Sequence, residues 1–463
     1  MISSKSLVIR DEIHGDMVFD GVVRDVIDHP SFQRLRYIKQ LGLAEYVFPC
    51  ANHSRFQHSL GAAYLAGRYF HQLLRAWTDT PFQEQIRSGE TDLFPDRTFQ
   101  CVKEVAEDTH SLRFWRQVAG LGGLLHDIGH GPWSHSFEQL EIEQDFSDRT
   151  EKLRGVLRSY FKDLDRYWHE DVSLVYIAHI LKDSAPEMIL PVACLVNKKL
   201  TTGKWREPVE KELREGLAVS RVRGGVEFHT LLRPIISGPF DVDRIDYIQR
   251  DGRNCGVSIG GIEWRRIVSK VIPCLADHPS ASDVQPRGVC LISNLKNQHV
   301  LDDFIFSLFQ MYAQVYLHPK IVGLEEEIKS CLQAKTKKLS KKPVVTFDVH
   351  HRLSDEKFRE WLVKEFSAPE IDDILLRRPA KSFRAASFPA ELRLTEELEA
   401  NQYRLVEIQD RPMMKDNMGI FVYSAIRKKG VKHFFVKPWA QVSPIAKHFE
   451  SISYSPNIWM QPE

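Results

Sequence analysis

An apolar stretch of this chain ends in an adjacent histidine and aspartate, and this pair constrains the fold more than any other feature. The stretch from Gly123 to Phe137 reads GLLHDIGHGPWSHSF, so His126 and Asp127 close an apolar run with no other ionisable side chain beside them. The run predicts a buried helix, and the glycines and proline that follow break it. The imidazole and the carboxylate form half of a metal site, so the fold has to bring further ligands to this helix end.

Two other segments supply the missing half. His58 lies in Arg-Phe-Gln-His upstream, and Asp243 lies in Asp-Val-Asp-Arg-Ile-Asp-Tyr downstream. Two imidazoles and two carboxylates suit one divalent transition metal, Fe, Mn or Zn, with positions left open for water or substrate. A lone His-Asp dipeptide arises by chance in many chains, but all four elements in order predict metal ligands at His58, His126, Asp127 and Asp243. The order resembles that of HD-domain metallophosphohydrolases.

Charge and composition narrow the kind of partner. The 463 residues include 63 Lys and Arg against 62 Asp and Glu, so no global basic field recruits nucleic acid. A small phosphorylated substrate is favoured over a nucleic acid. The seven cysteines are dispersed, no apolar run reaches the roughly 18 residues that span a bilayer, and the start lacks a signal pattern. We therefore expect a cytoplasmic protein without a membrane partner.

The hydrophobic pattern predicts a mainly α-helical fold. We expect an HD-domain helical core over residues 1–330 and a smaller mixed α/β region over 331–463, with a regulatory or oligomerisation role. Residues 78–114 are polar and poorly periodic, which predicts an insertion or loop. Helices are predicted over residues 31–43, 58–77, 116–128 and 297–321, and strands near 8–11, 289–292, 404–408, 419–423 and 432–436.

Several histidines near the metal pair are candidates for proton transfer and phosphate contact. His130 and His135 follow the His-Asp pair closely, and His169 opens a later helix. An imidazole with a pKa near neutrality can protonate a leaving oxygen or stabilise negative charge. Glu170 stands next to His169 and is expected to orient it as the carboxylate of a dyad.

Two arginines and two tyrosines complete the candidate site. Arg55 lies about one helical turn before the ligand His58, and Arg244 follows Asp243 directly, so both are expected to clamp a phosphate. Tyr247 and Tyr316 are expected either to contact a sugar and base or to pack in the core.

The chain resembles the deoxynucleoside triphosphate (dNTP) triphosphohydrolases of the HD superfamily over about residues 7–325. The resemblance covers the catalytic domain of the animal members, which also carry a sterile-alpha-motif domain, and the stand-alone bacterial members. It rests on residues 28–42, 47–49 and 53–61, on HDIGHGPWSH, WHED and DVDRIDYIQRD, and on residues 310–319. The resemblance implies metal-dependent hydrolysis of dNTPs to deoxynucleoside and inorganic triphosphate by attack at the α-phosphorus, with Mg²⁺ accompanying the triphosphate.

The resemblance also implies roles for individual residues. Triphosphate contacts fall to Arg55, Arg244, His130 and His135, with His169 as proton donor or phosphate-positioning residue. The deoxyribose would meet Gln40 and Leu41, with Tyr247, Asp251 and Tyr316 closing on the sugar so that a 2′-hydroxyl would clash.

Members of this family are activated by nucleotides at subunit interfaces. The resemblance places a dNTP or NTP effector at Val8, Asp28, Gln33 and Arg36, with distal phosphate contacts from Arg377 and Lys381. It implies a homotetramer built as a dimer of dimers. By composition alone, the basic face that Arg34, Arg36 and Lys39 would form on a helix over 31–43 is a solvated surface, and the resemblance makes it an effector surface instead.

Two other functions remain open from the sequence. HD sites also cut diesters, so the chain is alternatively a phosphodiesterase or single-strand nuclease. It is alternatively a nucleotide sensor of a defence system, in which ligand-driven assembly is the function. Metal analysis and a product assay on one dNTP separate the three hypotheses: free triphosphate, nucleotide products, or binding without turnover.

Overall fold

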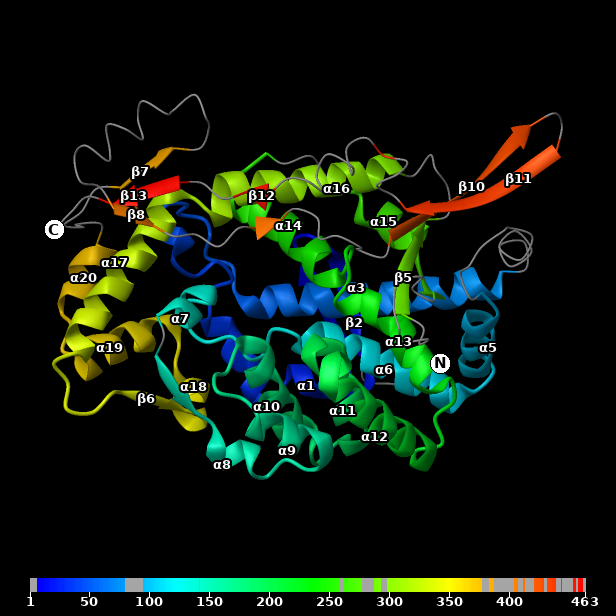
Figure 1. Ribbon diagram of the computed structural model, residues 1–463, viewed down its shortest axis with the longest axis horizontal. Coiled ribbons are helices and arrows are strands. Elements are labelled where there is room, and N and C mark those ends of the chain that lie inside the picture. Colours follow the sequence, from blue (N-terminus) through cyan, green and yellow to red (C-terminus); the bar gives the residue numbers. More distant parts are fainter. Residues whose placement is uncertain are drawn as a thin grey trace.

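Helices form most of the described chain in this computed structural model, which confirms the predicted mainly α-helical class (Figure 1). The residues that the structure describes are 6–79, 95–140, 142–258, 262–276, 287–292 and 298–376, with Ser443 and the C-terminal strands over 383–386, 404–406, 411–412, 420–428, 431–438, 453–454 and 457–460. Within this described part, no helix is long and apolar enough to cross a membrane.

The described part of the chain begins with a hairpin, whose first strand confirms the strand predicted near residues 8–11. Strand β1 (Leu7–Asp11) pairs antiparallel with β2 (Gly15–Phe19), in a register that sets Leu7 opposite Phe19. Gly15 enters β2 at a φ of +75°, a conformation that favours glycine. Helix α1 (Gly21–Ile27) follows and packs against α6 (Thr109–Leu125).

The predicted helix over 31–43 is wrong. Helix α2 (Pro30–Gln33) passes into a 3₁₀ turn over Arg34–Tyr37, and a second 3₁₀ turn spans Gly42–Tyr46. Between the turns the chain becomes extended and bonds to the segment before α3, with Gln40 N donating to His53 O at 2.9 Å. Backbone pairing with a distant segment therefore replaces helical bonds that the apolar spacing favoured.

Arg34 is also not part of an exposed basic face. The side chain is buried and donates to the carbonyls of Ile128 at 2.6 Å and His130 at 3.0 Å. Arg34 thus holds the turn that follows the His-Asp pair, and the surface expected from periodicity does not form.

Two long helices position the centre of the molecule. Helix α3 (Arg55–Thr78) lies against α6, and a Cβ on Gly123 would approach the carbonyl oxygen of Ala62 to 2.7 Å. Glycine therefore permits the close backbone contact that carries the end of α6 to the start of α3. Helix α14 (Val242–Cys255) packs on the same part of α3 (Figure 1).

The structure describes further helices over most of the chain. They are α5 (Pro95–Ala106), α7 (His135–Gln139), α8 (Ser147–Thr150), α9 (Gly155–Lys162), α10 (His169–Leu181), α11 (Ile189–Val196), α12 (Arg206–Val219), α13 (Gly225–Ile236), α15 (Trp264–Lys270), α16 (Gln298–Met311), α17 (Pro319–Thr336), α18 (Phe347–Arg352), α19 (Asp355–Glu365) and α20 (Glu370–Leu375). Short 3₁₀ turns cover Pro186–Met188, Lys198–Thr201 and Gly203–Trp205.

Two predictions about where helices lie differ from the structure. The segment 78–114, expected to be an insertion or loop, contains α5 and the first residues of α6, and residues 80–94 lie outside the described residues. The helices contradict the loop, whereas the insertion stays a prediction. Asp108 caps α6 by accepting from Ser111 N at 2.9 Å, a start signal inside the polar stretch. The long helix expected over 297–321 is interrupted by a π-helical turn at Tyr312–Tyr316, and Pro319 opens α17 as a separate helix.

Short sheets link early and late segments. Strands β4 (Val271–Ala276), β5 (Arg287–Ile292), β10 (Ile420–Lys428) and β11 (Val431–Pro438) form one sheet in the order β11-β10-β5-β4. The smaller sheets pair β3 (Glu143–Asp145) with β6 (Val344–Thr346), β9 (Arg411–Pro412) with β12 (Ser453–Tyr454), and β7 (Phe383–Ala386) and β8 (Arg404–Val406) with β13 (Asn457–Met460). The C-terminal strands confirm the predicted mixed character of that region, whereas its boundary at 330 stays a prediction.

Candidate metal centre

Four predicted ligands from three helices converge at the middle of the fold. His58 lies on α3, His126 and Asp127 directly follow α6, and Asp243 lies on the first turn of α14. One ligand atom of each residue lies within 4.8 Å of the others. His58 Nε2 is 3.1 Å from both His126 Nε2 and Asp243 Oδ1. The structure therefore brings together two imidazoles and two carboxylates that are far apart in the sequence.

The arrangement of the ring nitrogens fits a metal ion. His58 Nδ1 contacts Asp246 Oδ2 at 2.8 Å, and His126 Nδ1 contacts the carbonyl of Gly123 at 2.9 Å. An acceptor on Nδ1 sets the tautomer that leaves Nε2 with a lone pair, and both Nε2 atoms face the carboxylates. This donor set suits a divalent transition ion.

Charge is concentrated at this buried point. Burial disfavours protonation of His58, yet the hydrogen bonds and charges of Asp243 and Asp246 outweigh it and raise its pKa to about 10. Burial also opposes ionisation of Asp127 and Asp243, but nearby imidazoles lower the pKa of both carboxyls. Without an ion, the centre therefore holds ionised carboxylates beside a protonated His58. Metal binding has to release that proton.

A buried network behind His58 reaches the N-terminal hairpin. Asp246 accepts from Arg250 through both carboxylate oxygens at 2.9 Å, and its Oδ1 contacts His14 Nε2 at 2.7 Å. Arg250 also binds Asp11 of β1 at 2.8 Å. Sequence reasoning missed the roles of Asp246 and His14, although Asp246 lies inside the quoted acidic motif, three residues after Asp243.

Arg55 lies beside the centre as predicted, but its partners are protein groups. Its Nη1 donates to Asp127, its Nε donates to Ser134 Oγ at 2.8 Å, and the side chain is buried. Arg244 donates to the carbonyls of Gly238 and Pro239 at 2.9 and 3.3 Å. Burial disfavours its charge, but the nearby Asp241 carboxylate outweighs burial and raises the Arg244 pKa.

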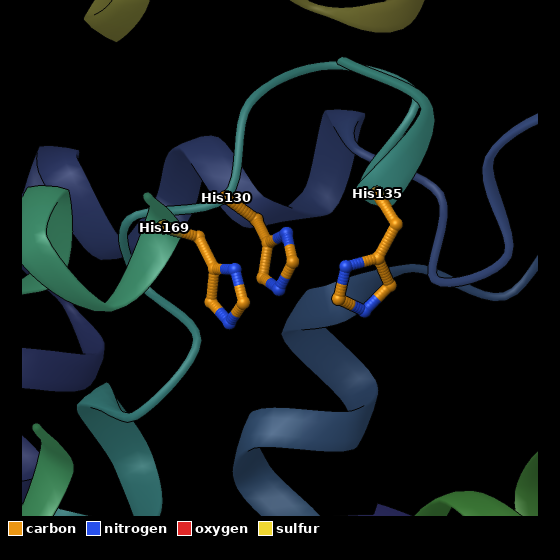
Figure 2. A group of neighbouring side chains, drawn as sticks. All are labelled: His130, His135 and His169. Atoms are coloured by element: carbon orange, nitrogen blue, oxygen red, sulfur yellow. The ribbon is translucent and has the colours of Figure 1, made fainter. Parts of the chain in front are cut away.

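The three candidate proton-transfer histidines form a second cluster (Figure 2). The rings of His130 and His169 stack with centroids 3.9 Å apart, and the ring of His135 lies edge-on to His130 at 4.7 Å. His130 Nε2 is 3.5 Å from Asp127 Oδ1, so the two clusters adjoin. The side chain of His135 is 65% exposed, which leaves this side of the cluster open to solvent.

Glu138, rather than the expected Glu170, makes the hydrogen bond to His169. Glu138 on α7 accepts from His169 Nδ1 at 2.8 Å, whereas Glu170 Oε2 is 3.7 Å away. Burial disfavours a proton on His169, but the Glu138 hydrogen bond outweighs it and raises the pKa of His169. Burial and the charge of Arg55 hold the pKa of His130 well below its usual value. Nothing in sequence spacing marks Glu138, which precedes His169 by 31 residues.

Three of the residues predicted to meet the sugar lie together near His58, namely Tyr316, Asp251 and Tyr247. The Tyr316 hydroxyl donates to Asp251 Oδ2 at 2.8 Å, and the Tyr247 ring lies edge-on to Tyr316 at 5.9 Å and 6.4 Å from the His58 ring. Gln40 is buried nearby through its backbone bond to His53, whose Nε2 contacts Asp251 at 2.7 Å. Leu41 is half-buried and packs against the core.

The predicted effector residues lie on the surface and are only partly described. Val8 is 58% exposed, and Asp28 and Arg36 are exposed. Arg36 donates to Gln33 Oε1 at 2.6 Å and lies over the Phe56 ring at 3.7 Å. Arg377 and Lys381 lie outside the described residues.

Comparisons with known proteins agree with this architecture. The family described as "HD domain" matches residues 55–251, a span that contains all four candidate ligands. The chain is 30% identical over 278 residues to the bovine deoxynucleoside triphosphate triphosphohydrolase SAMHD1, which is 58% of this chain and 39% of that protein. A SAMHD1 homologue of Dictyostelium discoideum is 30% identical over 315 residues, 68% of this chain and 46% of its own. The chain therefore spans less than half the length of these relatives.

Two solved structures share the fold. A hypothetical protein from Aquifex aeolicus superposes with a TM-score of 0.58 at 24% identity, covering 98% of this chain and 96% of its own. A phosphohydrolase from Bacteroides thetaiotaomicron superposes with a TM-score of 0.61 at 20% identity, covering 99% of this chain and all of its own.

Proposed function

We propose that this chain, an HD-domain protein related to the SAMHD1 deoxynucleoside triphosphate triphosphohydrolases, hydrolyses dNTPs to deoxynucleoside and inorganic triphosphate. One observation carries the proposal: a buried His/Asp donor set adjoins a cluster of three imidazoles, with 3.5 Å between Asp127 Oδ1 and His130 Nε2. The candidate metal ligands therefore lie directly beside the candidate phosphate contacts.

The donor set gives the site its reaction class. A divalent ion held by His58, His126, Asp127 and Asp243 would polarise a phosphate oxygen and make water a better nucleophile. Fe, Mn and Zn all suit this donor set, and Mg²⁺ would accompany the triphosphate.

The three histidines and Arg55 would receive the triphosphate. Attack of water at the α-phosphorus breaks the bond to the 5′-oxygen, and that oxygen takes up a proton as the deoxynucleoside leaves. His169 is suited to supply this proton because Glu138 stabilises its protonated form. His130 stays neutral by contrast and would donate a hydrogen bond to a phosphate oxygen.

The sugar pocket would lie on the Tyr316 side of His58. The Oε1 atom of Gln40 is buried and has no hydrogen-bond partner among the described residues, so a sugar hydroxyl can donate to it. Tyr316 is fixed by Asp251 and flanked by Tyr247, which leaves little freedom to accommodate a 2′-hydroxyl. Preference for deoxyribose follows from this rigidity.

We further propose that a second nucleotide, bound away from the metal centre, activates hydrolysis. Val8, Asp28, Gln33 and Arg36 would bind a dNTP or NTP effector together with Arg377 and Lys381 of another subunit, in a homotetramer. The exposure of Val8, Asp28 and Arg36 supports this role.

A substrate panel tests the proposal. The metal-depleted protein is reconstituted with Fe²⁺, Mn²⁺ or Zn²⁺ and offered each dNTP with Mg²⁺, with and without a second nucleotide. We expect turnover only after reconstitution, and a higher rate when the second nucleotide is present. Cleavage of single-stranded DNA without dNTP turnover supports the nuclease alternative, and binding without turnover supports the sensor alternative.

A further inference from the structure

Three imidazoles converge beside the metal centre from different elements. His130 lies in the turn after α6, His135 begins α7 and His169 begins α10, and their rings hang toward one side (Figure 2). One nitrogen from each ring lies within 4.8 Å of the other two. We propose that these histidines form a second cation site for a transition-metal ion such as Zn²⁺, separate from the His/Asp centre.

A carboxylate behind the rings orients two of them. Glu138 Oε1 contacts His169 Nδ1 at 2.8 Å, and its Oε2 contacts His135 Nδ1 at 3.4 Å. Glu138 is itself held, because Oε1 also accepts from the backbone N of His169 at 2.8 Å. A carboxylate on Nδ1 leaves Nε2 as the free ligand atom and makes it more basic, which is the usual support for metal-binding histidines.

The third ring is placed by packing. The ring of His130 stacks on that of His169 at an angle of 15°, and one nitrogen of each ring lies within 4.8 Å of the other. His130 Nδ1 is buried and has no hydrogen-bond partner among the described residues, and the ring's other nitrogen, Nε2, lies 3.5 Å from Asp127 Oδ1. A tetrahedral ion bound at about 2.0 Å needs ligand nitrogens about 3.3 Å apart, so binding requires the stacked rings to tilt toward the ion while the exposed His135 rotates to meet it.

The donor set selects the ion. Three imidazoles suit Zn²⁺, Cu²⁺ or Ni²⁺, whereas Mg²⁺ and Ca²⁺ prefer oxygen ligands. The fourth position would take water, as in sites with three protein ligands. This inference goes beyond the proposed function, because the Nε2 that carries a proton during hydrolysis would hold the ion in the nucleotide-free protein.

Metal stoichiometry tests the site without any turnover. The metal-depleted full-length protein is titrated with ZnCl₂ in the absence of nucleotide, by calorimetry and by equilibrium dialysis with elemental analysis. We expect two equivalents in the unmodified protein and one in His135→Ala. Glu138→Gln keeps both, but its second equivalent binds about 10- to 100-fold more weakly.

Two further variants show which site binds each equivalent of Zn²⁺. His126→Ala removes a ligand of the His/Asp centre and leaves the equivalent that His135→Ala removes. His110→Ala, an exposed histidine bound to Ser220 O, retains both. Circular dichroism checks that every variant is folded, which is expected for His135 because its side chain is mostly exposed. A single equivalent in the unmodified protein, or an unchanged second equivalent in His135→Ala, overturns the proposal whatever the protein hydrolyses.

Discussion

His58 Nδ1 lies 2.8 Å from Asp246 Oδ2, and both side chains are wholly buried. Asp246 therefore fixes the ring orientation of a candidate metal ligand from behind. Burial opposes ionisation of Asp246, but the charge of Arg250 and the hydrogen bonds of His14, His58 and Arg250 outweigh it and hold the Asp246 pKa well below its usual range. The N-terminal hairpin thus reaches the candidate centre through ordered polar contacts.

Gly61 provides the space for Asp246, and its replacement tests the network. A Cβ on Gly61 would overlap Asp246 Oδ1 and approach Arg250 Nη2 to 2.8 Å. We expect Gly61→Ala to lower the free energy of unfolding by about 1–3 kcal/mol and to weaken metal binding about tenfold or more. Thermal denaturation and competitive metal titration measure the two effects.

Gly67 on the same helix is the matched control. A Cβ there meets nothing within 4 Å, so Gly67→Ala should raise stability by up to about 1 kcal/mol and leave metal affinity unchanged. Equal metal affinities in the two alanine variants would show that Asp246 does not position His58.

The sequence predicted the four candidate metal ligands, but it did not predict the carboxylate that orients the neighbouring histidines. His58, His126, Asp127 and Asp243 stand in motifs with characteristic neighbours, so their convergence was predictable. Glu138 carries no such signal, because its pairing with His169 depends on how α7 packs against α10.

The fold, too, was predicted where local pattern determines it and was missed where contacts between distant segments determine it. The sequence pattern predicted the buried helix that leads to the His-Asp pair and the strand near 8–11, because both depend on local pattern and burial. The helix expected over 31–43 fails because Gln40 bonds to His53, a contact that no local pattern encodes. The polar stretch before α6 misled because α5 buries only one face, with Phe99, Cys101, Val102 and Val105 in the core.

Loss of a ligand should abolish metal binding while the fold survives. His126→Ala removes one imidazole from a donor set spread over three helices, and we expect the large hydrophobic core to keep the chain folded without the ion. We expect loss of the bound ion and a fall in kcat of more than about 100-fold, with a nearly unchanged melting temperature. His126→Ala is the better test because Asp127→Ala would also leave the buried Arg55 without its carboxylate partner and so destabilise the fold. Retained turnover in a verified metal-free protein would contradict the assignment.

The proton-donor role of His169 makes a pH prediction. Its pKa is raised by Glu138, so kcat should be maintained below that pKa and fall as the pH rises through it and the proton is lost. Glu138→Gln removes the charge that stabilises the imidazolium, so the alkaline limb should move to lower pH by about one unit. Glu170→Gln is the control and should move it much less, because Glu170 is 3.7 Å away and half-exposed. Identical profiles in the two variants would exclude Glu138 as the positioning residue.

Tyr316 should control the choice of sugar. Tyr316→Ala removes the ring held by Asp251 and opens space beside Tyr247, so dNTP binding should weaken and ribonucleotides should be tolerated. We expect the ratio of kcat/KM for dATP over ATP to fall about tenfold or more. Tyr37→Ala, at a 66% exposed position, should keep the ratio of the unmodified protein. Equal rates on ATP and dATP before any substitution would contradict the pocket assignment.

The central claim is hydrolysis at the α-phosphorus by the His/Asp centre, and product analysis in ¹⁸O-labelled water tests it most directly. The metal-reconstituted protein is incubated with one dNTP, and the products are separated and examined by ³¹P NMR and mass spectrometry. Attack of water at the α-phosphorus predicts deoxynucleoside without label and inorganic triphosphate carrying one ¹⁸O atom. Release of pyrophosphate or orthophosphate, or label in the deoxynucleoside, would contradict the account.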